Sequence, residues 1–191
     1  MRIKICGITT ARDALIAESL GADAIGVVVC SDSRRNVTLR KAREIFDALK
    51  PVTEKVLVTD TESHSNLEII MAQRPDAVQI THDFEFRERP PVRIIKTVNP
   101  GMTRPPSDCN AVIIDASMGN GTHFDRDFAS EVIKKTDIPV FLAGGLSPDN
   151  VGDAIRSLHP DGVDVSSGIE KSPGIKDREK VREFIRICRE A

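Results

Sequence analysis

Two side chains of the sequence could take part in proton transfer, a thiol and a carboxylate. Cys6 ends a short apolar run near the N-terminus and is followed at once by a glycine. Asp115 ends a second apolar run, VIID, where a carboxylate is costly to bury unless it is paired or faces a cleft. At the mouth of one site the two could form an acid–base pair. Each has a structural alternative, because most free cysteines are inert core residues and the aspartate could cap the following loop.

Two turns that contain glycine suggest an anion site. The segment LAGGLSPDNV has the pattern of a strand, a double glycine (Gly144 and Gly145) and a helix start, and DVSSGIE has Ser167 and Gly168 in a second small turn. Glycines let backbone N–H groups approach an anion closely, and a helix N-terminus favours negative charge. A single glycine pair usually only makes a tight turn, but two such turns on adjacent strands favour phosphate binding.

Other polar side chains stand at similar positions. Arg34 and Arg35 follow the second apolar run, where an arginine could stack on an aromatic ligand or bind an anion instead of facing solvent. His82 follows the fourth run, although a single histidine there is more often a loop residue than a catalyst. The four cysteines are scattered without C-x-x-C spacing, so the sequence indicates neither a zinc site nor a disulfide framework.

Short runs rich in valine and isoleucine alternate with helical patterns along the whole chain. Nearly continuous apolar character is typical of strands that are covered on both faces. The expected strands are 2–6, 24–29, 55–60, 77–80, 93–98, 111–116, 139–144 and 162–167. The expected helices are 11–20, 39–49, 64–73, 127–135, 148–158 and 177–189. Segments 83–91 and 99–110 are rich in proline and charge, so the helices after the fourth and fifth strands should be short or missing.

Eight such units predict a single α/β domain over residues 1–191, a compact (β/α)8 TIM barrel. An open doubly wound sheet is the alternative, but it normally has fewer strands, and the G-x-G-x-x-G turn that often marks it is absent here. Barrel active sites lie at the C-terminal ends of the strands, and the candidate residues all stand there.

The composition and charge of the chain indicate which classes of binding partner and which cellular location to expect. The formal net charge is -2, the hydrophobic content is 40% and no basic block occurs, so neither a nucleic acid nor a membrane surface is an expected partner. No stretch is apolar and long enough to span a bilayer, and the N-terminus does not resemble a signal peptide. We therefore expect a cytoplasmic protein.

The segments KICGIT, SRRNV, VIID followed by GNGTHFD, LAGGLSPDNV and DVSSGIEKSPGIKD resemble, in this order and from end to end, the phosphoribosylanthranilate isomerases of tryptophan biosynthesis. The resemblance implies a (β/α)8 barrel that performs an Amadori rearrangement of N-(5-phosphoribosyl)anthranilate to 1-(2-carboxyphenylamino)-1-deoxyribulose 5-phosphate. It implies Cys6 as general base and Asp115 as general acid, with no metal and no organic cofactor. It also implies a monomer or homodimer that acts on a small phosphorylated substrate.

The resemblance further implies a set of substrate contacts. Arg35 would contact the anthranilate ring, and Asp164 would lie beneath the site. The residues implied at the phosphate are Gly144, Gly145, Ser167 and Gly168. Two segments depart from the family: VQITHD has Thr81 at the usual histidine position, so either His82 replaces it through a shifted turn or the contact is lost, and GNGTHFDR differs from the usual G-G-x-G loop.

The implied chemistry suits these residue types. The furanose oxygen needs a proton to leave, which Asp115 can supply if burial keeps part of it protonated. Ring opening leaves a Schiff base that acidifies the C2 hydrogen, which a thiolate can remove. Because a free cysteine has a pKa of about 8.5, we expect cations such as Lys4, or the iminium itself, to favour the Cys6 thiolate.

Two other functions fit parts of the pattern. A sister isomerase of histidine biosynthesis does the same rearrangement on a larger substrate with two phosphates, but that family generally has an aspartate where Cys6 stands. A non-catalytic barrel that binds a phosphorylated metabolite would keep the glycine turns without needing both Cys6 and Asp115. The discriminating observation is whether these two side chains face one site that includes the phosphate turns.

Overall fold

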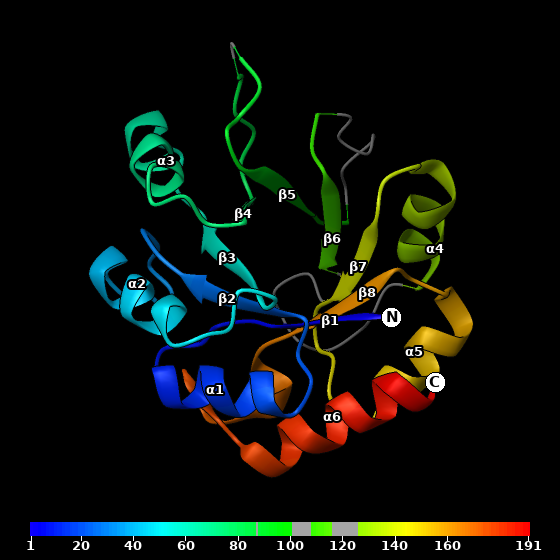
Figure 1. Ribbon diagram of the computed structural model, residues 1–191. Coiled ribbons are helices and arrows are strands. Elements are labelled where there is room, and N and C mark those ends of the chain that lie inside the picture. Colours follow the sequence, from blue (N-terminus) through cyan, green and yellow to red (C-terminus); the bar gives the residue numbers. More distant parts are fainter. Residues whose placement is uncertain (87, 101–107, 116–125) are drawn as a thin grey trace.

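Eight parallel strands close into a barrel with helices around it (Figure 1). The computed structural model describes residues 1–86, 88–100, 108–115 and 126–191. The strands are β1 (Arg2–Ile5), β2 (Ala24–Val28), β3 (Glu54–Thr59), β4 (Ala77–Ile80), β5 (Arg93–Val98), β6 (Ala111–Asp115), β7 (Val140–Ala143) and β8 (Gly162–Val165). Because β1 pairs with both β2 and β8, the predicted (β/α)8 barrel is confirmed and the open sheet is wrong.

The helices lie outside the barrel, where the sequence predicts them. They are α1 (Ala11–Ser19), α2 (Leu39–Asp47), α3 (His64–Met71), α4 (Arg126–Lys135), α5 (Val151–Leu158) and α6 (Arg178–Glu190). Hydroxyl or carboxylate side chains accept hydrogen bonds from the first turns of several of them, as Thr10 does for α1 and Asp177 for α6. Between β8 and α6 lie the short 3₁₀ helix η1 (Ser167–Ile169) and a hairpin of β9 (Glu170–Ser172) and β10 (Ile175–Lys176).

Helix α5 begins three residues later than the sequence suggests. The Asn150 side chain accepts a hydrogen bond from the Ser147 N–H at 2.9 Å and donates one to the Gly145 carbonyl at 2.9 Å. These bonds close a separate turn over 147–150, so the helix starts at Val151 and not at Pro148.

Among the described residues of the segment between β4 and β5, no helix forms, as expected from its prolines and charges. The segment extends away from the barrel in Figure 1. Its buried Phe84 contacts His64 of α3 edge to face, with the ring centroids 5.1 Å apart. Asp83 lies 2.6 Å from the amine of Lys96 on β5. The segment between β5 and β6 is non-helical at 99–100 and 108–110, and residues 101–107 lie outside the described part.

The barrel interior has a polar middle layer between two ends of different character. Lys4 is 1% exposed, and its amine donates hydrogen bonds to Gln79 Oε1 at 2.8 Å and Asp164 Oδ1 at 2.9 Å. Gln79 in turn donates to the Thr97 hydroxyl at 3.1 Å. The network satisfies polar groups that would otherwise be costly to bury, and it connects strands on opposite sides of the barrel.

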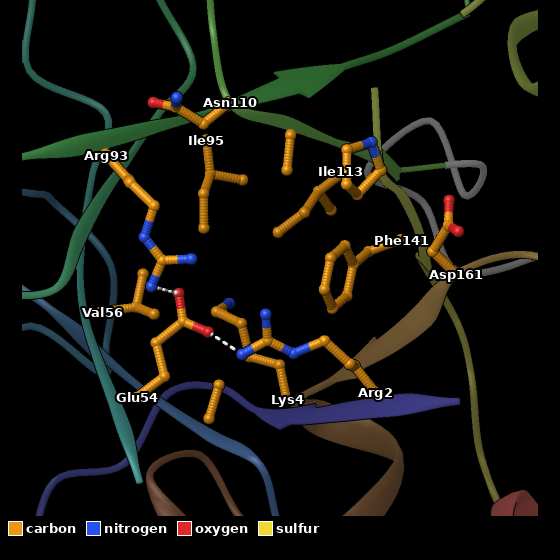
Figure 2. A pocket seen from close by; sticks show the side chains of 13 residues that line it. Arg2, Lys4, Glu54, Val56, Arg93, Ile95, Asn110, Ile113, Phe141 and Asp161 are labelled. Atoms are coloured by element: carbon orange, nitrogen blue, oxygen red, sulfur yellow. Dashed lines mark hydrogen bonds and ion pairs between the residues drawn. The ribbon is translucent and has the colours of Figure 1, made fainter. Parts of the chain in front are cut away.

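Below this layer, at the N-terminal ends of the strands, lies a hollow of about 330 Å³ (Figure 2). Small residues such as Ala24 and Ala111 leave the space, and Phe141 forms one wall. The carboxylate of Glu54 bridges the guanidinium groups of Arg2 and Arg93 across its mouth. This end of a barrel usually serves stability, and it lies opposite to the candidate site.

We predict that Glu54→Gln destabilises the protein by about 1–2 kcal/mol and leaves its activity unchanged. The Glu54 side chain is only 9% exposed and pairs with two arginines, so removal of its charge weakens both contacts. Denaturant midpoints measure the change. The control is Glu44→Gln, which removes exposed pairs on α2 and should cost less than about 0.5 kcal/mol. Equal losses in the two variants would contradict the prediction.

Candidate active site

Cys6 stands directly after β1, on the inner face of the barrel. Lys4 points inward and Ile5 points outward into the core around the helices, so the alternation along the strand turns Cys6 inward again. Its sulfur lies beside Gly26 of β2, where a β-carbon would come within 2.9 Å of Sγ. Gly26 was not among the predicted site residues. A glycine inside a strand pattern, as in AIGVVV, is the signal that could have identified it.

Opposing charges surround the Cys6 thiol. Burial raises its pKa, and the nearby carboxylate of Asp164 adds to this, while the positive charges of Lys4 and Lys176 lower it. Burial alone would lower the pKa of Lys4, but Asp164 and Cys6 raise it above the ordinary lysine value. The expected cation beside the thiol is therefore present. In this structure, however, burial outweighs the lysines and favours the protonated thiol.

Asp115 is the last residue of β6 and is partly buried. It is in register with Ala143 of β7, which belongs to the apolar cluster inside the barrel. Asp115 therefore shares the inner face and the C-terminal end of the barrel with Cys6. The loop that follows it, with most of GNGTHFDR, falls on residues 116–125, outside the described part.

The two glycine-bearing turns pack against each other. Gly144 and Gly145 adopt φ of +84° and +66°, which L side chains rarely adopt. A β-carbon on Gly168 would overlap the carbonyl oxygen of Leu146, so the turn after β8 needs a glycine to approach the turn after β7. Ser167 opens the 3₁₀ helix η1 at the same place. Backbone from two strands thus converges at the end of the barrel where Cys6 and Asp115 lie.

Arg35 extends over the end of β1. A β-carbon at Gly7, which has φ of +69°, would lie 2.5 Å from Arg35 Cδ and 2.6 Å from the hydroxyl of Ser166. The guanidinium forms two hydrogen bonds to Glu170, with Nε to Oε1 at 2.9 Å and Nη2 to Oε2 at 2.7 Å. Glu170 was not among the predicted site residues, because nothing in the local segment SSGIE indicates that its partner is the distant Arg35.

The remaining two predicted site residues have different surroundings. Asp164 lies inside the barrel beneath Cys6, where it pairs with Lys4. His82 lies after β4 at the same end of the barrel, but its side chain is 41% exposed, and its Nδ1 is 3.5 Å from a carboxylate oxygen of Glu62. The structure thus brings Asp164 to the centre of the site and leaves His82 on its rim.

Neither a metal cluster nor a membrane span is found in the part of the chain that the structure describes. Within it, no three or more His, Cys, Asp and Glu residues gather where they could hold a metal ion. None of its helices has the length and apolar character needed to cross a bilayer.

Comparisons with known proteins agree with this arrangement. The family model for N-(5'-phosphoribosyl)anthranilate (PRA) isomerase matches residues 3–187. An N-(5'-phosphoribosyl)anthranilate isomerase from Methanoregula boonei is 57% identical over 192 residues, which cover 100% of this chain and 98% of the relative.

Solved structures show the same likeness along the whole chain. Phosphoribosyl anthranilate isomerase from Thermus thermophilus has a TM-score of 0.85 at 30% identity, with 100% and 99% of the two chains covered. A phosphoribosyl anthranilate isomerase in complex with reduced 1-(o-carboxyphenylamino)-1-deoxyribulose 5-phosphate has a TM-score of 0.83 at 30% identity, with both chains fully covered. A structure of monomers derived from the dimeric Thermotoga maritima enzyme has a TM-score of 0.83 at 29% identity, with full coverage.

These matches name one reaction, and they favour it over the histidine-pathway isomerase and over a non-catalytic barrel. Together with the closed barrel, they establish an isomerase of tryptophan biosynthesis that rearranges N-(5-phosphoribosyl)anthranilate to 1-(2-carboxyphenylamino)-1-deoxyribulose 5-phosphate. The chain belongs to the N-(5'-phosphoribosyl)anthranilate isomerase family.

Proposed function

We propose that this isomerase uses Cys6 as general base and Asp115 as general acid in one site at the C-terminal end of the barrel. The observation that carries the proposal is the position of Cys6, which is held on the inner face of the barrel within the field of Lys4 and Lys176. Asp115 and the two packed glycine turns at the same end support it.

In the first step Asp115 donates a proton to the furanose ring oxygen, and the bond from C1 to that oxygen breaks. The anthranilate nitrogen supplies the electron pair, which leaves an open-chain iminium. Cys6 then removes the proton on C2. The electron pair of the broken C2–H bond neutralises the iminium and gives an enolamine. Tautomerisation moves the proton of the C2 hydroxyl to C1 and gives the ketone, so the substrate has no net proton change. Proton exchange through solvent then restores Asp115 as the acid and Cys6 as the base.

The buried thiol needs help to lose its proton. Burial raises the pKa of Cys6, and Lys4 and Lys176 offset only part of this effect. The iminium brings a further positive charge close to the thiol at the moment when a thiolate is required. The same charge also acidifies the C2 hydrogen, so the substrate contributes to the activation of its own base.

We assign the remaining predicted residues to substrate binding, except Asp164, whose carboxylate pairs with Lys4. The turns with Gly144, Gly145, Ser167 and Gly168 would hold the phosphate through backbone N–H groups. Arg35 would contact the anthranilate ring, and Asp164 would hold Lys4 beneath the base. His82 would make a contact at the rim, where Glu62 now faces it.

We further propose one domain over residues 1–191 that works in the cytoplasm on a small phosphorylated substrate, with neither nucleic acid nor membrane as a partner. The ordinary charge balance supports this. A monomer or a homodimer is expected, and the dimeric Thermotoga maritima relative supports the second. Sedimentation velocity distinguishes the two.

Replacement of the acid or the base should reduce turnover far more than it reduces the affinity for a substrate analogue. We predict that Cys6→Ser and Asp115→Asn each lower kcat by about 10²–10⁴-fold, while the affinity for the reduced product analogue changes little. Loss of anthranilate fluorescence measures turnover, and the chain has no Trp or Tyr to add background. Cys30→Ser, on the loop after β2, is the control and should stay active. Parallel losses of turnover and affinity would assign Cys6 and Asp115 to binding or folding.

Arg35→Ala should mainly weaken substrate binding. We expect KM to rise about tenfold with a smaller change in kcat, because contact between a guanidinium and an aromatic ring contributes about 0.5–2 kcal/mol. The same fluorescence assay gives both constants. Arg34→Ala, next to it in the loop, is the matched control. An unchanged KM would remove Arg35 from the site.

Gly26→Ala should displace the base. A β-carbon at position 26 would lie 2.9 Å from Cys6 Sγ, so we predict a loss in kcat of about tenfold or more. If this loss arises through Cys6, Gly26→Ala should add nothing to Cys6→Ser in the double variant. Additive losses would indicate a general disturbance of the barrel.

A further inference from the structure

A single buried carboxylate on the hairpin after β8 holds two cations at the mouth of the site. The side chain of Glu170, at the start of β9, is 4% exposed. It accepts hydrogen bonds from Arg35 Nε at 2.9 Å and Nη2 at 2.7 Å, and from the Lys176 amine of β10 at 2.9 Å. The backbone N–H of Gly174, at the tip of the hairpin, donates a fourth at 3.1 Å.

The charges in this cluster depend on one another. Burial would raise the pKa of Glu170, but Arg35 and Lys176 lower it below the usual glutamate range. Burial lowers the pKa of Lys176, and Glu170 opposes this effect. Because an unpaired buried charge is costly, the carboxylate and both cations stabilise one another in a fixed arrangement.

Both cations are thereby directed at the end of β1. Arg35 packs over Gly7, the residue after Cys6. Lys176 donates to the carbonyl of Ser166 at 3.1 Å and to its hydroxyl at 3.4 Å, and that hydroxyl also borders Gly7. The hairpin therefore holds one arginine and one lysine beside Gly7 and Ser166, at the end of β1 where Cys6 stands, and the charge of Lys176 lowers the pKa of the thiol.

We propose that Glu170 and Lys176 are positioning residues for the rearrangement: Glu170 fixes Arg35 against the substrate, and Lys176 supplies a positive charge that stabilises the Cys6 thiolate. This inference rests on the proposed roles of Arg35 and Cys6. The charged groups around the thiol are Lys4 from β1, Arg35 from the loop after β2, Asp164 from β8 and Lys176 from β10. The charge of Lys4 is balanced within the barrel by the carboxylate of Asp164. Lys176 pairs instead with Glu170, which it shares with Arg35.

The first test measures the thiol without using the reaction. Iodoacetamide alkylation of Cys6, followed by mass spectrometry of its peptide, reports the thiolate fraction at each pH. Removal of a nearby positive charge raises the thiol pKa, so Lys176→Met should alkylate about tenfold more slowly at neutral pH, which corresponds to a shift of about one pH unit. Lys176→Arg, which keeps the charge, should recover much of the rate. Lys171→Met, an exposed lysine on β9, is the control and should match the wild type.

The second test asks whether Glu170 acts through Arg35. Glu170→Gln should raise KM toward the value of Arg35→Ala, and the double variant should be no worse than Arg35→Ala alone. Circular dichroism and thermal midpoints check that each variant folds. If Glu170→Gln does not fold, the alkylation rates of the two Lys176 variants still decide the part that concerns the thiolate.

The outcomes separate this inference from the proposed mechanism. An unchanged alkylation rate in Lys176→Met, or additive KM effects of Glu170→Gln and Arg35→Ala, would overturn the corresponding positioning role even if Cys6→Ser is inactive. If Cys6→Ser stays active while Lys176→Met still slows alkylation, the mechanism fails and the electrostatic role of Lys176 remains.

Discussion

The ion pair between Lys4 and Asp164, 2.9 Å apart in the middle of the barrel, is the constraint on which the site depends. It joins β1 to β8, the strands that close the barrel. Gln79 accepts a further hydrogen bond from the amine of Lys4. Buried charges are tolerated only when they are paired and hydrogen-bonded, so this layer fixes the strands in register. Cys6 lies directly above it, and the charges that close the barrel are therefore among those that set the state of the thiol.

A second buried carboxylate completes the arrangement. Asp164 holds Lys4 from below, and Glu170 holds Arg35 and Lys176 from the side, so three cations are fixed by two carboxylates around one thiol. Burial still raises the pKa of Cys6. If Cys6 is the base, as we propose, it is weak until a positively charged intermediate forms beside it, and this limits its reactivity toward other compounds in the site.

The two ends of the barrel have separate tasks. Glu54 joins Arg2 and Arg93 at the N-terminal end, whereas the glycine turns after β7 and β8 shape the C-terminal end. The polar layer around Lys4 lies between them. Between β4 and β5 no helix forms among the described residues, and the buried side chain of Phe84 covers the barrel there. The groups at the centre of the proposed site come from β1, β6, β7, β8, the hairpin after β8 and the loop after β2, and only His82 at the rim belongs to the segment after β4.

The sequence by itself determined the strand and helix order, the closed barrel and the family, because apolar periodicity and turn glycines are local signals and the motifs occur in order along the chain. It also indicated that Cys6, Asp115 and the turns with Gly145 and Gly168 would share one end of the barrel. Only the tertiary structure decided that Gly26 makes room for the sulfur, that Asn150 delays α5, that His82 faces Glu62, and that Glu170 binds Arg35 from 135 residues away. These features depend on contacts between distant segments and on burial, and neither leaves a pattern in the local sequence.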